Sequence, residues 1–344
     1  MKKTIVVGMS GGVDSSVTAL LLKEQGHHVI GMFMKNWEEK DSQGVCNSSK
    51  EYDDVVRVCD KLDIPHYTVN FVEEYWNNVF THFLEDLKRG FTPNPDILCN
   101  REIKFKVFLE KALSLGADFL ATGHYCRIQE GKLLKGKDLS KDQSYFLYTL
   151  KPHILKKVLF PIGNLPKPEV RRIAKEHNLA TAEKKDSTGI CFIGKRDFRE
   201  FVKQYLPYQK GNFETLDGKI VGQHEGAAYY TIGQRKGLGI GGPGNAWFVV
   251  AKDMGRNVVI IEQGQDHPAL YKDHLQVIDL TWVNESPPFP FVCKAKIRYR
   301  QEEQECVIEN ESHVRFLSPQ RAITSRQSIV FYDRDVCLGG GLIL

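Results

Sequence analysis

Several familiar patterns are missing from the sequence. None of the eight cysteines forms a C-x-x-C pair, which excludes the usual ligand pairs of structural zinc and iron–sulfur sites and the cysteine pair of thioredoxin-like enzymes. No apolar stretch approaches the length of a signal-peptide core or a membrane span. We therefore expect a cytoplasmic protein with no membrane partner, in which any disulfide is catalytic rather than structural.

Charge of one sign is not in large excess either. Lysine and arginine number 47 against 43 aspartates and glutamates, and the net charge of +4 does not by itself indicate a nucleic-acid partner. The distribution is less even, because seven basic residues and a single acid, Glu169, lie between Lys151 and Lys175. This basic stretch is either a solvated helical face or a face that contacts phosphate groups.

The 344 residues exceed one typical domain, and their pattern changes along the chain. Over residues 1–200, short apolar runs alternate with segments of helical spacing, which predicts an α/β domain with a parallel sheet that binds ligands at the carboxyl ends of its strands. Short strand-like runs then predict two small β-rich domains, residues 201–265 and a β-barrel over 266–344. Strands are expected at 4–9, 28–34, 65–70, 118–121, 247–250, 258–261, 275–278, 292–300, 306–308 and 328–332, and helices at 17–23, 51–62, 76–87, 102–115, 167–177 and 195–205.

The first expected strand runs directly into the segment SGGVDSS at residues 10–16. Gly11 and Gly12 have no Cβ to block a phosphate, and the residues after them stand where helix N-caps and exposed amide groups bind anions. The segment lacks the Gly-Lys-Ser/Thr of a Walker A loop. It resembles instead the pyrophosphate loop of enzymes that split ATP between its α and β phosphates. A second glycine-rich segment, residues 237–244, precedes an expected strand rather than a helix, which predicts a structural turn.

Two cysteines stand in surroundings that suit a reactive thiol. Cys99 precedes an expected helix, where the pKa of a thiol can be lowered, and Asp96 lies three residues earlier. Cys191 lies between Gly189 and Gly194, which permit an exposed loop. Each thiol is also explained as a small buried hydrophobic side chain. Only the fold can join the two cysteines, because 92 positions separate them in the sequence.

An ordered set of segments resembles the tRNA-specific 2-thiouridylase family over essentially the whole chain. Members of that family replace the C2 oxygen of the wobble uridine, position 34, in certain tRNAs with sulfur. The segments are SGGVDSS (10–16), NPDILCN (94–100), ATGHY (121–125), DQSYFL (142–147), STGICFI (187–193), YTIGQRKGLG (230–239), residues 264–271 and CLGGG (337–341).

The resemblance implies a reaction in which ATP, bound with Mg²⁺, converts the C2 oxygen into an adenylate whose AMP can leave. Cys191 would carry the incoming sulfur as a persulfide, Cys99 would be the second catalytic cysteine and pair with it in a disulfide, and Asp96 would be the general acid/base. No metal site within the protein is implied. The expected partners are tRNA, by resemblance those for Lys, Glu and Gln, and a persulfide donor, either a sulfur-relay protein or a cysteine desulfurase.

The remaining site residues follow from matching positions. Those that match ATP-contacting residues of the family are Gly8, Met9, Ser10, Gly11, Gly12, Val13, Asp14, Ser15, Met34 and Gly123. Those that match tRNA-contacting residues are Asn94, Pro95 and Asp96 at the extruded base, and His124, Asp142, Gln143, Ser144, Arg298, Tyr299 and Gln327 elsewhere. Extrusion of the wobble base is feasible because the anticodon loop is already single-stranded.

The sequence departs from the family at one of these places. The family pattern has Pro-Gly before the glutamine, whereas this chain has Ser325 and Arg326 before Gln327. If the glycine has a positive φ, an arginine there costs roughly 1 kcal/mol, unless it gains a contact with a phosphate. Without the resemblance, Arg298 and Tyr299 are better explained as a strand pair, one extending to solvent and one packed.

Two other functions are compatible with parts of the sequence. A synthetase that adenylates a small metabolite would use the same loop, although the amidotransferases among such enzymes need an ammonia source and no glutaminase half is evident. A tRNA-binding module with a vestigial loop is the other alternative. The presence of Asp14, Asp96, Cys99 and Cys191 argues against that module.

Overall fold

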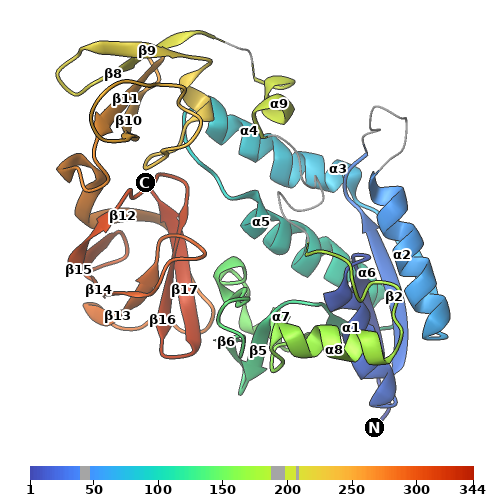
Figure 1. Cartoon of the computed structure of the whole chain (residues 1–344). Helices are drawn as coiled ribbons and strands as arrows, with labels where there is room; N and C mark the ends of the chain where they lie inside the picture. Colours follow the sequence, from blue (N-terminus) through green and yellow to red (C-terminus); the bar gives the residue numbers. More distant parts are fainter. Residues whose placement is uncertain (39–46, 187–197, 207–208) are drawn as a thin grey trace.

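The computed structural model describes residues 1–38, 47–186, 198–206 and 209–344 (Figure 1). A parallel sheet with its helices lies to the right in Figure 1, a small sheet at the upper left and a barrel at the lower left. The expected fold class, a parallel-sheet domain followed by two β-rich units of which the last is a barrel, is confirmed.

The first unit is built on a five-stranded sheet in the order β3-β2-β1-β4-β7. Each neighbouring pair in it is parallel. The chain moves outward from β1 through β2 to β3 and then returns to the other side of β1 to form β4 and β7. The carboxyl ends of β1 and β4 therefore meet at a switch in strand order, where open α/β sheets bind ligands. The strands are β1 (Thr4–Met9), β2 (His28–Lys35), β3 (His66–Asn70), β4 (Phe119–Ala121) and β7 (Val158–Leu159).

Helices cover both faces of this sheet, because successive side chains of a strand point to opposite faces. Ile5 and Val7 of β1 share one apolar cluster with α1, α2 and α8, whereas Val6 shares another with α4 and α6. The helical segments of this unit are α1 (Val13–Glu24), α2 (Asn47–Lys61), α3 (Val72–Tyr75), η1 (Trp76–Phe80), α4 (Thr81–Lys88), α5 (Pro95–Leu98), η2 (Cys99–Val107), α6 (Phe108–Ser114), η3 (Ser144–Phe146), α7 (Pro152–Leu155), α8 (Lys167–Glu176) and α9 (Phe198–Lys203).

The two β-rich units follow in chain order. The small sheet has the order β10-β11-β8-β9, and the barrel has the order β12-β15-β14-β13-β16-β17 and closes through β12–β17. The elements are β8 (Gly211–Glu214), β9 (Ile220–His224), η4 (Ala227–Tyr229), β10 (Trp247–Asp253), β11 (Val258–Gln263), η5 (Pro268–Leu270), β12 (Tyr271–Trp282), β13 (Phe291–Lys296), β14 (Gln304–Ile308), β15 (His313–Arg321), β16 (Ser328–Asp333) and β17 (Val336–Ile343).

Some boundaries differ from the sequence predictions. The helix expected at 102–115 belongs to a helical run that already starts at Pro95, and the helix expected at 51–62 starts at Asn47. A hairpin of β5 (Cys126–Gln129) and β6 (Lys132–Lys135) was not expected. Each of its strands has only four residues, too few for a clear alternation, and β6 pairs with β17 of the distant barrel. Within the described residues, no helix is long and apolar enough to cross a membrane.

The small sheet holds a partly buried lysine, Lys252, whose effect on the free energy of unfolding depends on pH. Burial lowers the pKa of Lys252 from 10.5 to about 8, and its Nζ donates to the carbonyl of Tyr230 at 2.7 Å. Between those two pH values the unfolded chain binds more protons here than the folded chain, so stability rises with pH in that window. Lys252→Met should raise the free energy of unfolding at pH 7 by on the order of 1 kcal/mol. Urea unfolding should show this gain disappearing near pH 10.5; an equal gain at both pH values would contradict the explanation.

Candidate active site

The expected phosphate loop is the turn from β1 into α1. Gly11 has a φ of 70°, and a Cβ at this position would lie 2.5 Å from the carbonyl oxygen of Glu51, so only glycine fits. The hydroxyl of Ser15 accepts from the amide of Ser10 at 3.2 Å and donates to the carbonyl of Gly12 at 3.1 Å. The turn is therefore held in shape by its own hydrogen bonds.

Asp14, in the first turn of α1, is the centre of a charged network. Its carboxylate accepts two hydrogen bonds from Lys167 Nζ, at 2.7 and 2.8 Å, and one from the hydroxyl of Tyr125 at 2.7 Å. Burial and the Asp14 charge raise the pKa of Tyr125 far above its ordinary value, so this phenol keeps its proton and donates. Lys167 also lies 2.9 Å from Asp186. Partial burial acts to raise the pKa of Asp186, but hydrogen bonds from Lys141 and Lys167 outweigh it and lower the pKa to about 2.

Two further cations approach the same loop. Lys184 Nζ donates to the carbonyl of Gly11 at 2.9 Å and to the carboxylate of Asp54 at 2.6 Å. Arg171 Nη2 donates to Asp186 at 2.7 Å. Lysine and arginine side chains held around a glycine turn at a helix N-terminus provide the charge and the donors that a polyphosphate requires.

The members of the basic stretch, residues 151–175, differ in their surroundings. Lys167 contacts Asp14 of the phosphate loop and Arg171 contacts Asp186, whereas Arg172 is exposed and pairs with Glu169 and Glu176 of its own helix. Sequence reasoning did not assign Lys167, Lys184 or Tyr125 to the site. The one available signal was the excess of basic residues before residue 175.

The end of β4 packs directly on the loop, as the strand order requires. A Cβ on Gly123 would lie 2.8 Å from the carbonyl carbon of Asp14 and 2.9 Å from the amide nitrogen of Ser15, so the two backbones touch. The neighbouring His124 is buried, with Nδ1 2.8 Å from the hydroxyl of Thr122. Burial lowers the pKa of His124 well below its ordinary value, and Lys104 adds to the effect, so the ring is neutral.

The segment with Asp96 and Cys99 forms the start of a long helical run. Asn94 caps it, accepting from the amide of Asp96 at 3.1 Å, and Pro95 takes the first helical position, which suits its fixed φ. Asp96 and Cys99 are three residues apart in helical geometry, which places them on one face of the helix. Cys99 is the first residue of the π-helical segment η2 and is fully buried, so access of a large substrate to the thiol requires movement of neighbouring groups.

The other expected tRNA-contacting residues lie around the junction of the first unit with the barrel. Asp142 is buried and accepts from the amides of Gly136 and Ser144, at 3.0 and 3.1 Å, while Gln143 accepts from the amide of Tyr125. Ser144 is fully buried as well. These three residues hold the turn that leads into η3, and their contact with tRNA stays a prediction.

Arg298 and Tyr299 follow strand β13 rather than forming part of it. Arg298 Nη2 donates to the carbonyl of Ala322 at 2.7 Å, and Tyr299 packs on Phe146 with ring centroids 4.4 Å apart. Burial lowers the pKa of Arg298, and the nearby charge of Arg321 adds to the effect. Burial raises the pKa of Tyr299 to about 12. The contact of Arg298 and Tyr299 with tRNA also stays a prediction.

The remaining predicted site residues lie in different parts of the chain. Gly8 and Met9 belong to β1, and Met34 is buried near the end of β2. Gln327 donates from Nε2 to the carbonyl of Thr92 at 2.5 Å. Cys191 lies outside the described residues.

The described residues contain no group of histidine, cysteine and carboxylate side chains that could hold a metal ion.

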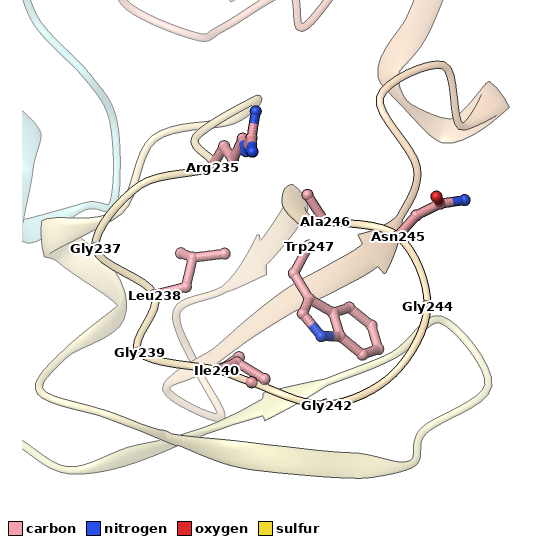
Figure 2. A pocket seen from close by; sticks show the side chains of 11 residues that line it. Arg235, Gly237, Leu238, Gly239, Ile240, Gly242, Gly244, Asn245, Ala246 and Trp247 are labelled. Carbon is pink, nitrogen blue, oxygen red and sulfur yellow. The ribbon is translucent and has the colours of Figure 1, made fainter.

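A separate cavity of about 440 Å³ lies in the central unit. Figure 2 shows the glycine-rich segment 237–244 running around the indole of Trp247, with Arg235 and Asn245 at its ends. A strand, β10, follows the segment, in agreement with the prediction of a turn rather than a nucleotide loop.

Models of known families match the chain in three consecutive stretches. They are the tRNA methyl transferase HUP domain over residues 3–195, the tRNA methyl transferase PRC-barrel domain over 199–263 and the aminomethyltransferase beta-barrel domain over 272–343. The chain is thus a HUP-domain protein of a tRNA-modifying class, with a PRC-barrel and a β-barrel domain after the HUP domain.

Curated relatives narrow this class. The chain is 64% identical to the tRNA-specific 2-thiouridylase MnmA of Protochlamydia amoebophila, covering 99% of this chain and 93% of the relative. It is 56% identical to MnmA of Oceanobacillus iheyensis (98% and 94% covered) and 57% identical to MnmA of Shouchella clausii (98% and 96% covered). The chain belongs to the tRNA-specific 2-thiouridylase family, as its motifs predicted.

The contact between the ends of β1 and β4 generates a testable prediction. Gly123→Ala inserts a methyl group where the loop backbone stands at 2.8 Å, so the loop must shift. We expect ATP to raise the unfolding temperature of the wild type and not to raise it in this variant. Gly255→Ala is the matched control, because its nearest neighbour would be an ordinary 3.6 Å away. An unchanged ATP shift in Gly123→Ala would show that nucleotide binding does not depend on this contact.

Proposed function

We propose that this chain catalyses the ATP-dependent 2-thiolation of the wobble uridine of tRNA. The observation that carries the proposal is the cation-lined phosphate loop at the switch point of the sheet, in a chain that is 64% identical to a tRNA-specific 2-thiouridylase over nearly its whole length. The loop is suited to bind the ATP that activates an oxygen atom. Membership of the family indicates that this atom is the C2 oxygen of the wobble uridine.

The phosphate loop fits ATP with Mg²⁺. Its Gly11 and Gly12 carry no side chain at the N-terminus of α1, and Lys167 and Lys184 stand at 2.7–2.9 Å from loop atoms. Asp14 accepts from Lys167 and can also attract a cation that accompanies the phosphates. Residues 8–15, Met34 and Gly123 are the proposed ATP-contacting residues. Bound ATP would supply the AMP group that makes the C2 oxygen a leaving group.

The sulfur step requires two thiols. A persulfide on Cys191 provides the terminal sulfur that forms the new C2–S bond, while the C2–O bond breaks and AMP leaves with the oxygen. The thiol of Cys99 attacks the remaining sulfur of Cys191, so that the persulfide S–S bond breaks and a disulfide between the two cysteines forms, which an external thiol later reduces. Release of the sulfur as hydrosulfide before it reaches C2 would use the same two thiols.

Asp96 is the proposed general acid/base in this scheme. It shares a helix face with Cys99 and follows the Asn94 cap and Pro95, which are proposed to meet the extruded base. The proposed partners are tRNAs for Lys, Glu and Gln and a persulfide donor, a sulfur-relay protein or a cysteine desulfurase. Contacts along the tRNA are assigned to His124, Asp142, Gln143, Ser144, Arg298, Tyr299 and Gln327.

The direct test is mass analysis of nucleosides from tRNA incubated with the protein, ATP, Mg²⁺ and a persulfide donor. Wild-type protein should exchange one oxygen for sulfur at uridine 34, and Cys191→Ser and Cys99→Ser should each reduce this product to background, because either thiol is indispensable to the S–S chemistry. Cys293→Ser, at a cysteine of barrel strand β13 that the proposed chemistry does not use, is the control. A Cys191→Ser variant that still thiolates tRNA would contradict the role proposed for Cys191. ATP–pyrophosphate exchange that depends on a metabolite instead of tRNA would favour the synthetase alternative.

Lys167 provides a second prediction for the activation step. Lys167→Met removes the cation shared by Asp14 and Asp186, and we expect the apparent Kd for ATP to rise by about tenfold or more, since a charged hydrogen bond to phosphate contributes roughly 1.5–3 kcal/mol. Arg172→Met on the same helix removes an exposed cation that pairs with Glu169 and Glu176, and it should leave the Kd unchanged. Equal effects of the two variants would remove Lys167 from the proposed ATP site.

A further inference from the structure

The turn between β15 and β16 reaches out of the barrel and contacts the first unit just before Asn94. The amide of Thr92 donates to the carbonyl of Ser325 at 3.3 Å, and the carbonyl of Thr92 accepts from Gln327 Nε2 at 2.5 Å. Both backbone polar groups of Thr92 are therefore bound by the barrel, from positions on either side of Arg326.

Arg326 itself has a backbone conformation that arginine seldom adopts. Its φ is 66°, which costs an L-residue with a long side chain free energy relative to glycine. Its Nε lies 3.4 Å from Asp86 Oδ1 of α4, and its guanidinium lies over the ring of Phe91, 5.4 Å from the centroid. The side chain thus joins the barrel to the last turn of α4 and to the residue before Thr92, which offsets the backbone cost.

The central unit contacts the same segment from another side. The hydroxyls of Thr92 and Thr231 lie 3.4 Å apart. Gly90, with a φ of 80°, packs so closely on Met254 that a Cβ would lie 2.4 Å from that side chain. Residues 90–92 are consequently a place where all three units of the protein meet.

This junction is directly connected to the proposed catalytic residues. Only Pro93 separates Thr92 from Asn94, the cap of the helical run that carries Asp96 and Cys99. Two prolines in this short link, Pro93 and Pro95, restrict its conformations, so the place where Thr92 is held determines where the helix begins.

We propose that Arg326 is a positioning residue, whose ion pair with Asp86 and contact with Phe91 couple the barrel to the helix that carries Asp96 and Cys99. The inference rests on the proposed thiolation. It predicts that the Arg326–Asp86 pair affects the rate of the chemical step with tRNA bound, whereas a phosphate-contacting arginine would affect the affinity for tRNA.

The test compares Arg326→Gly, Asp86→Asn and the double variant in single-turnover thiolation of a tRNA with uridine at position 34. Arg326→Gly also relieves the backbone cost, so loss of folding is not its expected effect. Each single variant should slow thiolation by about tenfold, since a small displacement of reacting groups has effects of that size or larger. The double variant should be no slower than Arg326→Gly, because that variant has already lost the ion pair with Asp86. The Kd for tRNA and its salt dependence should stay at the wild-type values.

Arg315→Ala, which breaks an exposed barrel ion pair with Glu309, is the matched control and should change none of these quantities.

Two results of the tRNA measurements would overturn the proposal. The first is a weaker tRNA affinity with a flatter salt dependence in Arg326→Gly but not in Asp86→Asn, which would make Arg326 a phosphate contact. The second is wild-type thiolation rates in both single variants.

Amide hydrogen exchange gives a readout that does not need activity. Peptides covering residues 90–99 should exchange faster in both variants than in the wild type and in Arg315→Ala. If the wild-type protein does not thiolate tRNA, the proposed function fails, while unchanged exchange in both variants would refute the coupling itself.

Discussion

The contact between two backbones at the centre of the parallel sheet is the constraint on which the site depends. Gly123, at the end of β4, leaves no room for a side chain beside Asp14 and Ser15 at the start of α1. This contact fixes the phosphate loop against the strand on the other side of the switch point. It also places Tyr125, two residues farther along, where its hydroxyl reaches the Asp14 carboxylate. The position of the loop in the fold therefore depends on residues more than a hundred positions away.

The charges around the loop follow from that arrangement. Asp14, Asp54 and Asp186 each hold at least one lysine, so cations are already in place where a polyphosphate would bind. The paired carboxylates hold these lysines in place, and neither member of a pair is left unpartnered in the partly buried site. An incoming anion then finds donors that need little rearrangement, which is the condition under which electrostatic stabilisation is most effective.

Sequence reasoning found the parts of the fold and site that are encoded locally. The β1–loop–α1 unit is recognisable because glycines and hydroxyl residues follow a short buried strand, and the order of strands and helices indicates a parallel sheet. Lys184 and Tyr125 were not found, since their roles arise from the packing of segments far apart in the sequence. The depth of Cys99 was also not evident, because the helix was expected to start after the cysteine and starts four residues before it. The possible positive φ at position 326 was anticipated from the glycine of the family pattern, whereas the partners Asp86 and Phe91 required the structure.

Short segments of the chain connect the proposed sites of activation and of sulfur transfer. The loop at residues 10–16 and the helix that starts at Pro95 belong to one domain, and residues 90–92 join that helix to both other units. The most direct test of the central claim, that the loop activates the oxygen which sulfur replaces, is the stoichiometry of a single turnover with radiolabelled ATP, tRNA and a persulfide donor. The account predicts one AMP and one pyrophosphate for each sulfur found at uridine 34, with neither formed when tRNA is omitted. Formation of ADP, or of sulfur-containing uridine without AMP, would contradict it.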